Sequence, residues 1–324
     1  MSKKRFLTVI LGLIILALFI TACNNDDDDN GDVYTTPPSV IDVPPPTDDV
    51  PSVPATIYDR IGMEVSLPAE INTIVAIAPS ISEIIIALGL GDSIVAADNN
   101  FVEGLNPSLK VLDMFGLDLE HIISLNPDLV VATDMIMFAG DPLQAIRDLG
   151  IAVAYIPSSD SIEGVKEDIR FLAQVLGVPA RGDEIIAEMA AEIASIQAIV
   201  QNITDRRTVY FEISASPFTF GSDTFLHELV DLAGGINIFE DMVGWFSPSI
   251  EEVLVREPDV ILTSTNYIDN PIGEILNRSG WGVLTAIQEG NVHFIDTDDS
   301  SRPSQNIVRA IREIATVLYP ELFN

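Results

Sequence analysis

One long amphipathic helix is predicted between residues 181 and 204, inside a chain of 324 residues. Its apolar residues recur at intervals of 4, 4, 3, 4 and 3, so they share one helical face. At 1.5 Å per residue the helix is roughly 35 Å long, about the width of a whole lobe. The helix is therefore expected to act as a rod between two lobes. Its apolar positions are Ile185, Met189, Ile193, Ile196, Val200 and Ile203.

Short apolar strands alternate with helical stretches on both sides of this rod. Before it, apolar runs such as 73–77 and 129–132 are separated by helical patterns, and the same rhythm restarts near residue 209. Such alternation is typical of parallel sheets covered by helices on both faces. The predicted fold class is α/β, with two Rossmann-like lobes of mainly parallel sheet joined by one long α-helix. The expected boundaries are 57–180, 181–204 and 205–324.

The two halves also resemble each other in sequence. Residues 119–130 (LEHIISLNPDLV) match residues 250–261 (IEEVLVREPDVI) at a constant offset of 131. In each copy a helical pattern ends at a proline turn, and an aspartate precedes a buried strand. An ungapped match of this length favours an internal duplication.

The first residues have the pattern of an export signal. A cationic start precedes an apolar run, which ends in small residues before the chain's single cysteine, Cys23. We expect residues 1–23 to be a lipoprotein signal and Cys23 to be lipidated, which would hold the protein at the outer face of the cell membrane. An uncleaved transmembrane helix is the alternative, since the run approaches the lower length limit of roughly 17 residues. Residues 24–56, rich in Asp and Pro, are expected to form a disordered spacer.

Charge and composition exclude several classes of function. The formal net charge is −33, which argues against nucleic acid as a partner. With three histidines and one cysteine, a bare-metal site is not expected. The sequence has no Gly-x-Ser-x-Gly elbow, no His-Glu-x-x-His motif and no phosphate-binding glycine loop. No catalytic residues are therefore predicted, and the protein is not expected to be an enzyme.

Loops after the strands provide the candidate ligand site. In open α/β sheets the ligand binds at the carboxyl ends of the strands, so two facing lobes would form a cleft there. Several of these loops carry aromatic or sulfur-containing side chains, which ligand contact explains better than packing does. The predicted ligand-binding residues are Pro79, Ser80, Asn99, Phe101, Met135, Phe138, Phe218, Phe220, Trp245, Tyr267, Asp298 and Arg302.

Four segments, in order, resemble the substrate-binding proteins of cobalamin, ferric-siderophore and haem ABC importers. They are VAIAPSISE at 75–83, NPDLV at 126–130, FGSDTF at 220–225 with LAGG at 232–235, and SRP at 301–303. The resemblance covers residues 71–323. It implies two lobes bridged by a rigid helix, a small-molecule ligand held between them, and delivery to a membrane permease with its ATPase.

The resemblance also implies one acidic residue on each lobe that docks on the permease. In the C-terminal lobe this position is Glu251, six residues after Trp245, which matches the cleft tryptophan of cobalamin binders. The N-terminal position is open between Asp141 and Glu120, the latter being the repeat partner of Glu251. Thr133 stands where cobalamin binders place a second aromatic residue, so the chain departs from the cobalamin pattern at this position.

The expected ligand is a metal chelate, either a corrinoid such as cobalamin or a ferric siderophore, and no resident cofactor is expected. Haem is an alternative, for which Met135, Met137 and Tyr267 are candidate axial ligands. A chelatase-like enzyme on the same architecture is the alternative from another functional class.

Overall fold

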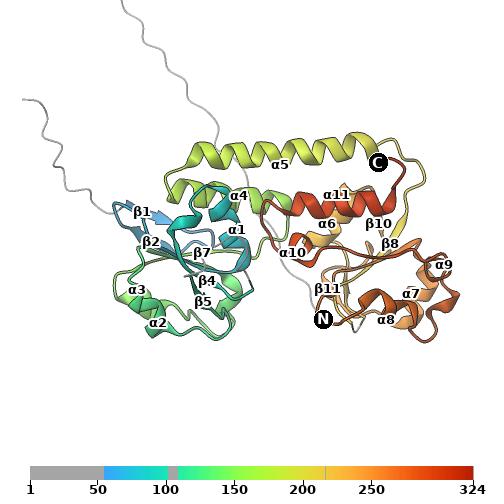
Figure 1. Cartoon of the computed structure of the whole chain (residues 1–324), viewed down its shortest axis with the longest axis horizontal. Helices are drawn as coiled ribbons and strands as arrows, with labels where there is room; N and C mark the ends of the chain where they lie inside the picture. The colour runs from blue at the N-terminus through green and yellow to red at the C-terminus, as the bar shows by residue number, and fades with distance from the viewer. Residues whose placement is uncertain (1–54, 101–108, 216, 324) are drawn as a thin grey trace, which may run out of the picture. The chain divides into compact units, whose positions relative to one another are not determined.

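The computed structural model describes residues 55–100, 109–215 and 217–323 (Figure 1). The expected signal, the lipidation site Cys23, nearly all of the expected spacer and Phe101 lie outside these residues. The described part has an α/β lobe on each side of one long helix, α5 (Pro179–Val200). The predicted fold class is confirmed, because the main sheet of each lobe is parallel.

The N-terminal lobe contains a five-stranded parallel sheet in the order β5-β4-β3-β6-β7. Every residue of β3, β6 and β7 is buried, which explains why these strands appear as unbroken apolar runs in the sequence. An antiparallel hairpin precedes the sheet. The elements are β1 (Ala55–Tyr58), β2 (Glu64–Leu67), β3 (Ile74–Ile77), α1 (Pro79–Ala87), η1 (Gly91–Ser93), β4 (Ile94–Asp98), β5 (Lys110–Leu112), α2 (Leu119–Ser124), β6 (Leu129–Thr133), η2 (Asp134–Met137), α3 (Gln144–Asp148), β7 (Ala152–Ile156) and α4 (Ile162–Val175).

The C-terminal lobe contains a four-stranded parallel sheet in the order β10-β8-β12-β13. The strands β9 and β11 form a separate two-stranded antiparallel sheet. The elements are β8 (Thr208–Glu212), β9 (Thr219–Phe220), α6 (Phe225–Leu232), β10 (Ile236–Asn237), β11 (Trp245–Phe246), α7 (Ile250–Arg256), β12 (Val260–Thr263), α8 (Pro271–Leu276), η3 (Trp281–Val283), α9 (Thr285–Gln288), β13 (Val292–Phe294), α10 (Thr297–Ser301) and α11 (Ile307–Leu318).

Two segments expected as loops are helical in the structure. Pro79 and Ser80 form the first turn of α1, because the fixed φ of proline and its missing N–H suit that position. Residues 297–301 form α10, where the Asp296 side chain accepts a hydrogen bond from the backbone N–H of Asp299 and caps the helix.

Helix α5 packs with its predicted apolar face against α4 and α11 (Figure 1). Five of the six expected positions are buried, and Ile203 lies beyond the end of the helix. Gly182 allows α4 and α5 to approach closely, since a Cβ there would lie 2.5 Å from the Cβ of Ala173. One continuous cluster of buried apolar residues extends from the N-terminal lobe through α5 into the C-terminal lobe.

The repeat seen in the sequence has the same hydrogen bonds in both lobes. Asp118 and Ser249 each cap the helix that follows, as the acceptors of a backbone N–H three residues on. Residues 126 and 257 both adopt a left-handed backbone, with φ of 47° and 45°. Asp128 accepts hydrogen bonds from the N–H and Oγ1 of Thr73, as Asp259 does from Thr208. The matching networks support a duplicated unit in the two lobes.

A buried carboxylate joins the lobes on one side of the cleft. Glu83, on α1, is 7% exposed and accepts hydrogen bonds from Arg302 at 2.9 Å, from Asn306 at 3.0 Å and from the hydroxyl of Ser304. The reciprocal contact is made by Glu228 on α6, which accepts a 2.7 Å hydrogen bond from the backbone N–H of Ile162. We call the first group the Glu83 clamp.

Among the described residues, no helix is long and apolar enough to cross a membrane.

Replacing Glu83 by alanine is expected to lower the free energy of unfolding by about 3 kcal/mol, because it removes the acceptor of a largely buried arginine. Equilibrium urea unfolding measures this loss. The exposed Glu64→Ala is the matched control, with an expected change within about 0.5 kcal/mol. Equal stability of the two variants would show that the clamp does not hold the lobes.

Candidate functional site

Two adjoining hollows lie between the lobes. The larger, of about 510 Å³, is lined mainly by the C-terminal lobe together with residues 158–160 of the N-terminal lobe. The smaller, of about 340 Å³, is lined by the N-terminal lobe and by residues around Arg302. They share four lining residues, Ser158, Thr297, Ser301 and Pro303. We treat them as one cleft with a C-lobe hollow and an N-lobe hollow.

Trp245 forms an aromatic wall of the C-lobe hollow. It is 50% exposed and lies on β11, where it pairs with Phe220 of β9. Phe220 is fully buried and meets the indole edge-on at 5.8 Å, while Phe218 stacks on it at 6.4 Å. Trp245 therefore faces the hollow, and the two phenylalanines, which do not line it, fix the orientation of the indole.

Tyr267 is the second aromatic residue of the C-lobe hollow, beyond the carboxyl end of β12. The residue is 65% exposed, and its hydroxyl accepts a 2.8 Å hydrogen bond from the backbone N–H of Ala215. Asn266 lines the hollow beside it. An anchored but exposed ring of this kind can contact an apolar ligand face while its hydroxyl still donates a hydrogen bond.

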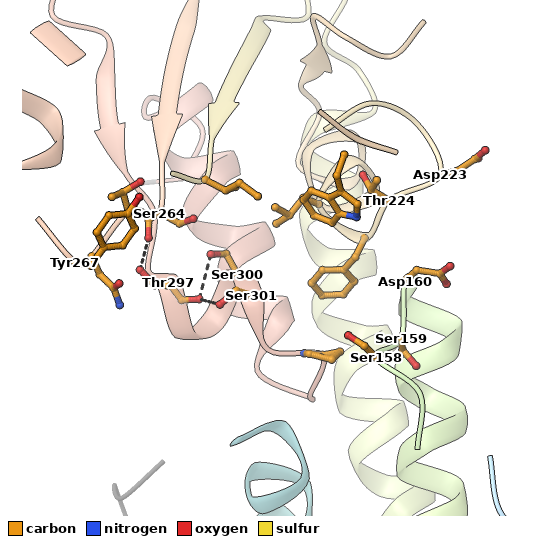
Figure 2. Close-up of a pocket in the computed structure, with 17 residues that line it drawn as sticks. Ser158, Ser159, Asp160, Asp223, Thr224, Ser264, Tyr267, Thr297, Ser300 and Ser301 are labelled. Carbon is orange, nitrogen blue, oxygen red and sulfur yellow. Dashed lines mark hydrogen bonds between the residues drawn. The ribbon is translucent and has the colours of Figure 1, made fainter. Parts of the chain in front are cut away.

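Hydroxyl groups line much of the C-lobe hollow and were largely missed in the sequence (Figure 2). They occur in loops after β7 and β12, at the N-cap of α6 and in α10, where serine and threonine have no distinctive spacing. Figure 2 shows Thr297, Ser300 and Ser301 grouped near Ser264 on the side of Tyr267. The hydroxyl-bearing residues are Ser158, Ser159, Thr224, Ser264, Thr265, Thr297, Ser300 and Ser301.

The N-lobe hollow contains five of the predicted residues: Pro79, Ser80 and Met135, and the pair Asp298 and Arg302. Met135 is 52% exposed, so its thioether is available to a ligand. The hollow also contains Met114 and the 63% exposed Phe115, which were not predicted. Both follow β5, whose three residues give too short an apolar run to be recognised as a strand. Recognition of β5 as a strand would have identified both residues as candidates, because they directly follow it.

Asp298 and Arg302 line the N-lobe hollow as a pair. The guanidinium of Arg302 lies 2.7 Å from the Asp298 carboxylate and 2.9 Å from that of Glu83, and it donates a 2.8 Å hydrogen bond to the carbonyl of Asn100. Arg302 is thus part of the Glu83 clamp. Its charge is compensated by two carboxylates within the protein.

Two further predicted residues lie away from the two hollows. Phe138 lines a further hollow of about 370 Å³ on the N-terminal lobe, together with Asp141, and this hollow shares Met114 and Phe115 with the N-lobe hollow. Asn99 is exposed next to Asn100, which lines the N-lobe hollow in its place.

The three predicted docking carboxylates differ in their surroundings. Glu120 and Glu251 are exposed in the first turns of α2 and α7, and neither forms a hydrogen bond or ion pair with another described residue. Asp141 is held by Tyr155 at 2.6 Å, by the backbone N–H of Leu143 at 2.9 Å and by Arg147. Burial alone would raise the pKa of Asp141, but these hydrogen bonds outweigh it and lower the pKa.

Comparisons with known proteins agree with this architecture. Residues 74–298 match the model of a family described as periplasmic binding protein. An uncharacterized ABC transporter substrate-binding lipoprotein of Bacillus subtilis, YvrC, is 29% identical, with 83% of this chain and 87% of the relative covered. A vitamin B12-binding protein of Vibrio parahaemolyticus is 26% identical, with 75% and 88% covered. The structure of the haem-binding protein RhuT from Roseiflexus is 28% identical with a TM-score of 0.67, covering 77% of this chain and 98% of that one.

The Asp141→Asn variant is expected to be less stable than the wild type by about 1–3 kcal/mol at neutral pH, because Tyr155 and Arg147 lose a charged acceptor. A lowered pKa in the folded state gives stability that is present above the ordinary aspartate pKa of about 4 and is lost as pH falls through the lowered value. Unfolding from pH 7 to pH 2 should therefore bring the two proteins together. A constant difference over this range would contradict the network.

Proposed function

Because the chain belongs to the periplasmic binding protein family, we propose that it captures a metal chelate, a corrinoid or a ferric siderophore, and delivers it to an ABC permease. The observation that carries this proposal is the cleft between two parallel-sheet lobes, walled by Trp245 and Tyr267. Planar, partly apolar chelates suit a cleft with exposed aromatic faces and hydroxyl edges. The family consists of solute-binding proteins, and no catalytic step is proposed.

The names of the relatives support a chelate as cargo. One relative is named for vitamin B12 and a structural neighbour for haem, both of which are metal macrocycles. Haem remains the second candidate, because the exposed thioether of Met135 and the hydroxyl of Tyr267 could each approach an iron centre.

The proposed location is the outer face of the cell membrane, through a lipid on Cys23. The Bacillus subtilis relative, whose alignment covers 83% of this chain, is named a lipoprotein. The sequence before Cys23 also has the pattern of an export signal. Anchoring would keep the cleft close to the permease, which with its ATPase is the proposed partner.

Glu120 and Glu251 are the proposed docking pair. They occupy equivalent positions of the duplicated unit, and Figure 1 shows α2 and α7 on the side of the lobes away from α5. Both carboxylates are exposed and are available to cationic groups of a partner. Asp141 is the weaker candidate, because its carboxylate is already engaged by Tyr155 and Arg147.

Trp245→Ala is expected to weaken chelate binding by about 1–3 kcal/mol, the contribution of one buried aromatic face. Titration with cyanocobalamin and with a ferric siderophore, followed by calorimetry, measures the change. Trp281 is the second of two tryptophans and is fully buried, so Trp281→Phe should keep the fluorescence quenching caused by ligand. If quenching is lost in Trp281→Phe and kept in Trp245→Ala, then Trp245 does not contact the ligand.

The double variant Glu120→Ala/Glu251→Ala is expected to bind ligand with wild-type affinity but to support much less uptake in cells. Exposed charges of this kind act on association with a partner rather than on the cleft. Asp92→Ala, another exposed carboxylate, serves as the control and should leave both readouts unchanged. Wild-type uptake by the double variant would contradict the docking role.

A further inference from the structure

Five of the eight serine and threonine hydroxyl groups that line the C-lobe hollow donate their proton to another group of the protein. Thr297 donates to the carbonyl of Ser264 at 2.5 Å, and Ser301 donates to that of Thr297 (Figure 2). Ser300 donates to the carbonyl of Asp296 at 2.6 Å. Thr224 likewise donates to the carbonyl of Gly221 at 2.9 Å, and Ser159 donates to Asp168. A carbonyl can only accept, so the direction of these bonds is fixed by chemistry.

What these hydroxyls can offer to a ligand is therefore lone pairs. A serine or threonine hydroxyl has one proton and two acceptor sites, so it can still accept after donating. Of the five, Thr297 and Ser301 are not buried, whereas Ser159, Thr224 and Ser300 are. The possible donors in the hollow are the indole N–H of Trp245, the amide of Asn266 and the hydroxyls of Tyr267, Ser158, Ser264 and Thr265, and each of these four hydroxyls can also accept. The hollow favours ligands that present N–H or O–H groups.

The charged side chains that line the cleft also disfavour an anionic ligand. Asp160 and Asp223 line the C-lobe hollow, one from each lobe, and Figure 2 shows both on the side opposite Tyr267. Neither forms a hydrogen bond or ion pair with another described residue, and both are exposed. These two carboxylates would repel an anion that enters the hollow.

No cation in the cleft loops balances these carboxylates. Among the described residues of the cleft loops, at 99–100, 109, 113–118, 133–143, 156–161, 213–215, 217–224, 241–249 and 264–270, there is no Lys, Arg or His. Arg302 is the basic residue of the segment 296–303, and it is paired with Glu83 and Asp298. A carboxylate of the ligand would enter the cleft without a counterion, which is costly where water is excluded.

We infer that the cargo is a metal chelate that carries no net negative charge and presents hydrogen-bond donors, such as a corrinoid with primary amides or a cationic ferric hydroxamate. This inference rests on the proposed function and selects among its ligands. Chelates with free carboxylates are disfavoured by the charge of the lining, and these include citrate-type siderophores and haem, the second candidate above.

Two matched pairs of probes test the inference by calorimetry. The first is cyanocobalamin and its monocarboxylate, in which one primary amide has been hydrolysed. The second is ferrioxamine B, which carries an ammonium group, and its N-succinyl derivative, which carries a carboxylate. In whichever pair binds, the carboxylate form is expected to bind at least tenfold more weakly. A change of this size in affinity is typical of losing one hydrogen bond that involves a charged group.

Variants identify the residues responsible. Asp160→Asn/Asp223→Asn should reduce the ratio within a pair to about threefold, because the repulsion between carboxylates is removed. Asp92→Asn is the matched control outside the cleft and should leave the ratio unchanged. Thr297→Val, which keeps the side-chain shape, should weaken the amide or ammonium form more than the carboxylate form.

The outcomes distinguish failure of the charge inference from failure of the proposed function. Binding of haem or of a carboxylate form as tightly as its uncharged or cationic partner overturns the charge inference and leaves the importer function intact. Failure of both pairs and of haem to bind contradicts the chelate function itself, and the charge inference falls with it.

Discussion

The apolar face of α5 is the constraint on which the rest of the structure depends. Its buried residues, from Ile185 to Val200, belong to a cluster of apolar residues that is continuous from one lobe to the other. Burying such a face against α4 and α11 stabilises the relative position of the two sheets, because any large opening would expose it to water. The Glu83 clamp adds a polar contact between the lobes beside the cleft. The cleft is therefore expected to be largely formed before ligand arrives.

Duplication explains why the cleft has two similar walls with different chemistry. The equivalent hydrogen bonds of Asp128 and Asp259 fix each first strand to the loop before β6 or β12, so both sheets present their carboxyl ends in the same way. The side chains on the loops then differ: Met135 and Phe115 line one wall, and Trp245 and Tyr267 line the other. The scaffold is shared, while the contacts available to a ligand come from the loops.

The sequence was informative where the signal was local. The buried strands and α5 follow from hydrophobic periodicity, Tyr267 and Met135 follow from their places after strands, and Trp245 follows from its loop before a helix and from the family resemblance. Long-range pairing was not accessible, since Arg302 is separated from its partner Glu83 by 219 residues. Phe115 was missed because β5 is only three residues long. The polarity of the serine and threonine lining depends on which backbone carbonyls lie within reach, and no sequence pattern encodes that.

These features combine into one account: a preformed cleft, aromatic on its walls and acceptor-rich at its edges, holds a chelate that bears no net negative charge. The most direct measurement is native mass spectrometry, with absorbance spectra, of the protein purified from its natural host with cargo bound. We expect one bound ligand per chain, which contains a metal and carries no net negative charge. A metal-free ligand such as a sugar or peptide, or a polycarboxylate chelate, would contradict it.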